Sequence, residues 1–131
     1  ARVSTPAAPT APDPSGTSFL VRLGRALHEA GYSAPELEAA LSRMAARLGV
    51  RGQFFSTPTS LQFGFGEGDE QRTYLERVEP SPLDLGRLAE LHRLIERVAD
   101  GEMTPVQAAP LVDWIARARP RYGTRKTIAA P

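Results

Sequence analysis

The apolar positions of the chain change their spacing twice, from helical to alternating and then back to helical. In residues 17–30 they recur every three or four positions, which predicts a helix with one buried face. Residues 33–48 repeat this spacing, and Ser33 and Glu36 stand where the two polar residues of a capping box would stand. Gly31 falls between the two stretches, at a position where helices commonly end. The two helices are therefore predicted to form a hairpin with a short joint.

The middle of the chain alternates apolar and polar residues, as a half-buried β-strand does. The alternation is strict in residues 60–65. The face that this strand would bury carries Leu61, Phe63 and Phe65. Shorter β-type segments span residues 53–57 and 72–78, and the glycine-rich polar stretch 66–70 suits a turn between the last two strands. We expect a three-stranded antiparallel meander.

Helical spacing returns in the last part of the chain. Ser81 can cap a helix whose first residue is Pro82, with Asp84 near the positive end of the helix dipole. Thr104, which is followed by a proline, starts the last helix in the same way, and Pro110 inside that helix predicts a kink or a later start. The order of elements is then α-α-β-β-β-α-α. This order predicts an α+β fold in which the helices pack on one face of the sheet.

Composition divides the 131 residues into three parts. Residues 1–16 are rich in proline and alanine and carry too little apolar surface to offset the entropy cost of ordering, so we expect a disordered arm. Residues 17–119 form the predicted α+β domain. Residues 120–131 form a basic tail. No segment has the roughly 18 consecutive apolar residues that a membrane-spanning helix needs.

The sequence shows no recognisable catalytic group, cofactor site or metal site. The absence of cysteine excludes disulfides, thiolate catalysis and cysteine-bound metals. His92 and Glu96 could share a helix face, but such a pair is at most half of a metal site. We interpret His92 and the other histidine, His28, as residues at the boundary of the core. The glycines of residues 64–68 lie between two predicted strands, which favours a hairpin turn over a phosphate loop. We expect no enzyme, no cofactor and no metal.

Positive charge is concentrated near the end of the sequence, although the net charge is only +1. No acidic residue follows Asp113, whereas Trp114 and Tyr122 accompany a basic run. The run consists of Arg117, Arg119, Arg121, Arg125 and Lys126. Basic residues with aromatic neighbours are typical of the cytoplasmic boundary of a membrane. They also suit nucleic acid, or a charged tail with no special role, but the low net charge leads us to expect no nucleic-acid partner.

Several segments together resemble the threonine/serine exporter family. They are FLVRLGRAL (19–27), FFSTPTSL (54–61), DLGRLAELHRL (84–94), VADG (98–101) and TPVQA (104–108). The resemblance spans about residues 18–120 and rests on the order and spacing of these segments rather than on one motif. His92 departs from the family pattern, in which asparagine is expected, so no role is carried over to that side chain.

The resemblance implies a soluble N-terminal domain on the cytoplasmic face of the membrane, ahead of a hydrophobic helix bundle that exports threonine and serine with the proton motive force. It also implies that residues 120–131 are a basic juxtamembrane tail that precedes a transmembrane region absent from this chain. The domain would be regulatory or gating. Its partners would be the transmembrane domain of the same protein and, through the basic run, an anionic membrane surface. Two alternatives stay open: a small hydrolase-like domain fused to a transporter, and a free adaptor that binds a partner through its basic tail. Exposed strand edges could also pair two copies into a homo-oligomer.

Overall fold

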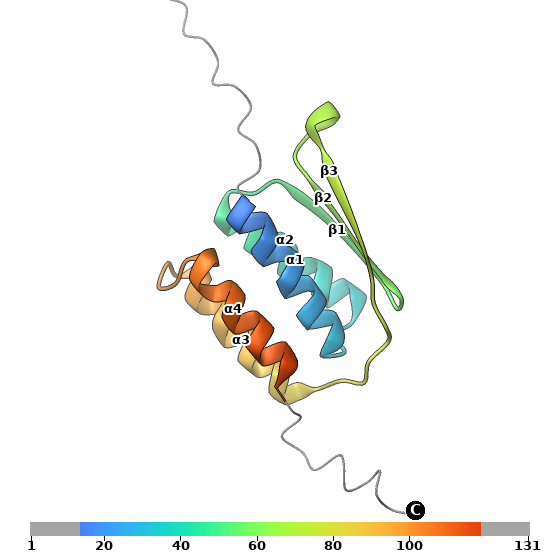
Figure 1. Cartoon of the computed structure of the whole chain (residues 1–131), viewed down its shortest axis with the longest axis vertical. Coiled ribbons are helices and arrows are strands. Elements are labelled where there is room, and N and C mark those ends of the chain that lie inside the picture. The colour runs from blue at the N-terminus through green and yellow to red at the C-terminus, as the bar shows by residue number, and fades with distance from the viewer. Residues whose placement is uncertain (1–13, 119–131) are drawn as a thin grey trace, which may run out of the picture.

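The computed structural model describes residues 14–118 as four helices and a three-stranded antiparallel sheet (Figure 1). The elements are α1 (Pro14–Glu29), α2 (Ala34–Leu48), β1 (Gly52–Thr57), β2 (Ser60–Phe65), the short 3-10 helix η1 (Gly68–Glu70), β3 (Arg72–Arg77), α3 (Leu85–Ala99) and α4 (Pro105–Arg117). The predicted order of helices and strands and the α+β class are confirmed. Within residues 14–118, no helix is both long enough and apolar enough to cross a bilayer.

The elements form three layers. Helices α1 and α2 lie against one face of the sheet, and α3 and α4 cover the other side of this helical pair (Figure 1). The helices therefore pack on one face of the sheet, as predicted, but in two layers rather than one. Helix α1 lies in the middle and contacts α2, α3, α4 and the sheet, which is why its apolar stripe is fully buried.

The sheet is a meander in the order β1-β2-β3, and its register places Phe54, Phe63 and Tyr74 side by side. The residues of β2 that face the helices are buried, as the alternation predicts: Leu61, Phe63 and Phe65. Phe63 lies under Gly24 of α1, where a Cβ atom would be 2.9 Å from the phenyl ring. Glycine at this position therefore lets α1 approach the sheet closely.

Helix α1 begins earlier than predicted. Residues 14–16, which belong to the predicted disordered arm, form its first turn. Proline is tolerated there because its missing N–H would have no partner in the helix. The hydroxyl of Thr17 donates a hydrogen bond to the Pro14 carbonyl at 3.2 Å and reinforces this turn. Residues 1–13 of the predicted arm and the predicted tail, 120–131, lie outside the described residues.

Helix α3 begins later than predicted. Its first residue is Leu85 rather than Pro82, and its N-cap is Asp84 rather than Ser81. The backbone N–H of Asp84 donates to the Ala30 carbonyl at 2.8 Å. This bond holds the residues before Asp84 against the end of α1, so the helix can start only after the chain has crossed that end.

The predicted N-terminal caps of α4 and α2 have different outcomes. At the start of α4 the predicted cap, Thr104, is confirmed, and the structure shows that it belongs to a full capping box. The backbone N–H of Gln107 donates to the Thr104 hydroxyl at 3.2 Å, and the backbone N–H of Thr104 donates to the Gln107 side chain at 3.0 Å. At the start of α2, the Ser33 hydroxyl instead donates to the Glu36 carboxylate at 2.9 Å and makes no cap bond to the backbone. The hydroxyl is a donor in this bond and would be an acceptor in a cap, so the predicted capping box is absent although both of its side chains are present and in contact.

Helix α4 runs without a break through Pro110, so the predicted later start is wrong. The proline ring removes one helix hydrogen bond, the one to the carbonyl of Val106. Both residues are exposed, so water can satisfy that carbonyl and the loss is small.

Candidate functional site: the junction between α1, α3 and α4

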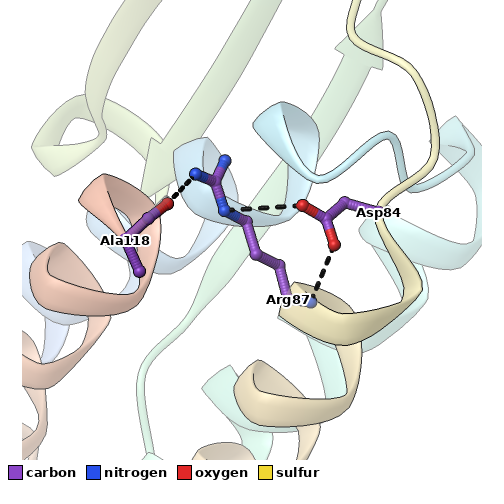
Figure 2. Close-up of polar contacts among 3 residues, drawn as sticks. All are labelled: Asp84, Arg87 and Ala118. Atoms are coloured by element: carbon purple, nitrogen blue, oxygen red, sulfur yellow. Dashed lines mark hydrogen bonds and ion pairs between the residues drawn. The ribbon is translucent and has the colours of Figure 1, made fainter. Parts of the chain in front are cut away.

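The guanidinium of Arg87, in the first turn of α3, links the start of that helix to the end of α4. Figure 2 shows its side chain between the Asp84 carboxylate and the Ala118 carbonyl. Its Nη2 donates a hydrogen bond to Ala118 O, and its Nε lies 3.6 Å from Asp84 Oδ2. The other carboxylate oxygen, Asp84 Oδ1, accepts from the backbone N–H of Arg87 at 3.0 Å. One carboxylate therefore caps α3 and also orients the arginine.

The junction is largely shielded from solvent. The Asp84 and Arg87 side chains are only 18% and 21% exposed, so their attraction is screened less than that of a surface pair. A second link joins α4 to α1, because Arg22 of α1 and Asp113 of α4 form an ion pair at 3.0 Å. With the bond from Asp84 N–H to Ala30, these contacts fix the end of α4 relative to both α1 and α3.

The junction lies where the basic run begins. Arg117 is the last residue of α4 and is exposed, and Ala118, the next residue, is held by Arg87. The structure therefore places one of the five basic residues proposed as membrane-proximal. The other four lie outside the described residues: Arg119, Arg121, Arg125 and Lys126.

His28 is buried rather than at the boundary of the core, so that prediction is wrong. Its Nε2 lies 2.9 Å from the Thr57 carbonyl and must donate, because a carbonyl only accepts. Nδ1 is also buried and has no hydrogen-bond partner among residues 14–118. The histidine lines a cleft of about 240 Å³ together with Ser33 and Ser81. These hydroxyls donate to a glutamate carboxylate and to a backbone carbonyl, so neither is activated by the histidine.

His92 is half-buried and pairs with Tyr32, a partner that the spacing of the sequence did not indicate. Its Nε2 lies 3.1 Å from the tyrosine hydroxyl, and the two rings meet edge to face at 5.4 Å. Burial, with a smaller contribution from Glu36, raises the pKa of the Tyr32 hydroxyl above its ordinary value. His92 and Glu96 both line a cleft between α2 and α3, but no metal-binding group of three side chains exists within residues 14–118.

The role of Arg87 was missed because the sequence suggests only helix-surface ion pairs for the arginines of α3. The spacing of Asp84 and Arg87 is a usable signal, since residues three apart on a helix are neighbours. The contact with Ala118 joins residues 31 positions apart and leaves no local trace in the sequence.

Replacing Arg87 by glutamine is expected to lower the free energy of unfolding by about 1–3 kcal/mol. The hydrogen bond to the Ala118 carbonyl and the positive charge that balances the Asp84 carboxylate are lost together. Urea denaturation followed by circular dichroism measures this change. Arg93→Gln is the matched control, since Arg93 is exposed on the same helix, and it should change the value by less than about 0.5 kcal/mol. Equal effects of the two substitutions would show that the junction adds no stability.

Comparisons with curated proteins and with solved structures give no match. A protein-family model, ThrE, described as "Putative threonine/serine exporter", matches residues 18–130. The match covers the whole described domain except its first turn, and it includes the junction and the basic run. The chain therefore belongs to the threonine/serine exporter family.

Proposed function

We propose that this chain is the cytoplasmic N-terminal domain of a threonine/serine exporter driven by the proton motive force, and that it regulates or gates transport. The family match carries the proposal. Export requires a path through the membrane, and no helix of residues 14–118 can span one. The proposal therefore assigns the transport path to a transmembrane domain of the same protein, and it assigns the domain described here to the cytoplasmic face.

The junction offers a physical route from such a membrane domain to this one. Arg87 holds the carbonyl of Ala118, immediately before most of the basic run. Because α4 is also tied to α1 by the ion pair between Arg22 and Asp113, a displacement of the basic run would be transmitted to two helices of the core. A rigid coupling of this kind suits a domain that senses or sets the state of a transporter.

A hydrolase-like activity has less support. Its strongest argument is the cleft that contains His28 beside serine hydroxyls. A nucleophile must share a hydrogen bond with its base, and neither ring nitrogen of His28 makes such a bond. Nε2 donates to the Thr57 carbonyl, and the buried Nδ1 has no hydrogen-bond partner among residues 14–118. The hydroxyl of Ser33 donates to the Glu36 carboxylate, and the hydroxyl of Ser81 donates to the Glu79 carbonyl. These contacts therefore give no support to the hydrolase-like alternative.

The proposed placement predicts both topology and lipid binding. In the full-length protein, a reporter fused to residue 1 should read cytoplasmic, because positively charged segments resist translocation. The isolated chain should bind anionic vesicles weakly and in a salt-sensitive manner, since each basic residue near the surface contributes about 1 kcal/mol. Glutamine at all five positions of the basic run should reduce this binding to the level seen with neutral vesicles. Vesicle co-sedimentation measures the effect.

A matched control removes the same number of charges from the folded domain. It replaces exposed arginines by glutamine: Arg43, Arg47, Arg51, Arg77 and Arg93. This variant should keep most of the vesicle binding. A periplasmic reporter would refute the orientation, and equal losses in the two variants would refute a specific role of the basic run.

A further inference from the structure

The two edges of the sheet differ in what covers them. At the outer edge of β1, the backbone N–H of Ser56 donates to the Glu38 carboxylate at 2.8 Å, and α2 lies alongside this strand. The opposite edge belongs to β3, which pairs only with β2 within residues 14–118. An uncovered edge presents backbone donors and acceptors that another strand can use. The free edge of β3 is therefore the place in the described structure where a strand can be added.

The register shows which backbone groups of β3 point outward. The Val78 N–H donates to the Thr59 carbonyl at 3.0 Å, so these residues form a hydrogen-bonded pair of the antiparallel ladder. Such pairs recur at every second residue. The residues of β3 that bond to β2 are therefore Arg72, Tyr74 and Glu76. The backbone groups of the alternate residues point away from β2: Thr73, Leu75 and Arg77.

Apolar surface reaches this edge. Leu75 is 68% exposed and aligns with Phe55, which is 57% exposed, across the face of the sheet opposite the helices. On the other face, Tyr74 is 41% exposed and lines a cleft of about 560 Å³ between β3 and α1. A second strand placed beside β3 would cover part of both surfaces, so its addition is favoured by burial as well as by hydrogen bonds.

We infer that the occupant of this edge is β3 of a second copy, paired antiparallel about a two-fold axis at Tyr74. In this register Thr73 of each copy lies opposite Leu75 of the other copy, and the two residues exchange backbone hydrogen bonds. The N–H and C=O groups of both residues point outward, as this pairing requires. Arg72 then lies opposite Glu76 of the second copy, and Glu76 lies opposite Arg72. Opposite charges in directly facing positions stabilise a strand pair. The result is a six-stranded sheet with a self-complementary interface, as two-fold symmetry demands.

The neighbouring registers are less favourable. A two-fold axis at Leu75 leaves both Arg72 and Glu76 without a charged partner across the interface. An axis at Glu76 places the two carboxylates against each other, which is destabilising. Charges on an edge strand ordinarily prevent pairing. Here their spacing about Tyr74 makes one register complementary and selects it over the others.

The test exploits the charge pattern. Arg72→Glu alone creates facing carboxylates, and Glu76→Arg alone creates facing guanidinium groups, so each variant should be monomeric. Glu76 also pairs with Arg25 of its own copy, and Glu76→Arg breaks that pair as well. Arg72→Glu is therefore the decisive single variant. An equimolar mixture should form a heterodimer, because each facing pair then joins opposite charges. Arg77→Glu is the matched control: in this register Arg77 faces the neutral Gln71, so its dimer should persist. Sedimentation velocity at concentrations up to about 1 mM reports the mass, since an interface of this size binds weakly.

A second variant tests the register without changing charge. The chain has no cysteine, so one introduced thiol is unique. Tyr74→Cys would place two thiols across the axis in a non-hydrogen-bonded pair, where the Cα separation of about 4.5 Å permits a disulfide. Mild oxidation should then cross-link the Tyr74→Cys variant at least about tenfold faster than a Gln53→Cys variant, whose thiol lies on the covered edge strand β1. Only the two thiols at position 74 would meet the geometry that a disulfide requires.

Three results would overturn the inference. The first is a wild-type chain that remains monomeric over the whole concentration range. The second is an Arg72→Glu variant that dimerises as well as the wild type, or an equimolar mixture that fails to form heterodimers while both variants keep their circular dichroism spectra. The third is a monomer in which the outward amides of β3 (Thr73, Leu75 and Arg77) resist hydrogen exchange, because another segment of the same chain would then occupy the edge.

Discussion

Replacing Phe63 by alanine is expected to lower the free energy of unfolding by about 3–5 kcal/mol, the range for loss of a fully buried phenyl ring. Phe63 is only 1% exposed. Its ring stacks on Phe65 at 6.2 Å and meets Phe54 edge to face at 6.1 Å, so its removal leaves a cavity against two rings and α1. Chemical denaturation followed by circular dichroism gives the value.

Phe55→Ala is the control for this prediction, because Phe55 lies on the same sheet but faces away from the helices and is largely exposed. It should cost less than about 1 kcal/mol. A Phe63→Ala curve that coincides with the wild type would contradict the burial of the β2 face, and with it the packing of α1 on the sheet.

Replacing Gly31 by alanine is expected to destabilise the domain by roughly 2–5 kcal/mol, which combines backbone strain with overpacking. Gly31 has a φ angle of +81°, which alanine adopts only with strain. A Cβ atom would also lie 2.5 Å from the Pro82 carbonyl oxygen and 2.6 Å from Leu83 Cα. These are backbone atoms, so they cannot move aside without shifting the whole segment that leads into α3.

Gly49 separates the two causes. It has a φ angle of +70°, but a Cβ atom there would meet nothing within 4 Å. Gly49→Ala should therefore cost only the strain, about 1–2 kcal/mol. Comparison of thermal and urea unfolding for the two variants isolates the contact with the 82–83 segment. If both variants lose the same stability, that segment does not press on Gly31 in solution.

Sequence periodicity predicted the elements of this fold and their buried faces, because each buried stripe is a local pattern; it did not predict the second layer of helices. The alternation around Phe63 identified the central strand and the face that it buries. Gly31 was predicted only as a helix end, since the crossing of the chain at Pro82 is not local. The same limit moved the cap of α3 from Ser81 to Asp84: both residues are acceptable caps by type, and the bond to Ala30 selects the second.

The candidate site was less predictable than the fold. The basic run is visible in composition, but only Arg117 of its members lies in the described residues. The hydrogen bond from Arg87 to the Ala118 carbonyl depends on how α3 and α4 pack together, and the spacing of residues within either helix does not predict it. His28 stands at the side of an apolar stripe, and sequence periodicity alone does not distinguish a residue at the edge of the core from one that the β1–β2 turn covers.

The central position of α1 has a consequence for the order in which the chain can fold during synthesis. Its long interface with α4, which includes the ion pair between Arg22 and Asp113, joins residues 91 positions apart. Of the described elements, α1 leaves the ribosome before the others, and α4, which covers its outer face, leaves after them. Until α4 emerges, the apolar stripe of α1 can pack only against α2, α3 and the sheet. Part of this stripe therefore stays exposed until α4 has emerged, and exposed apolar surface of this kind favours chaperone binding.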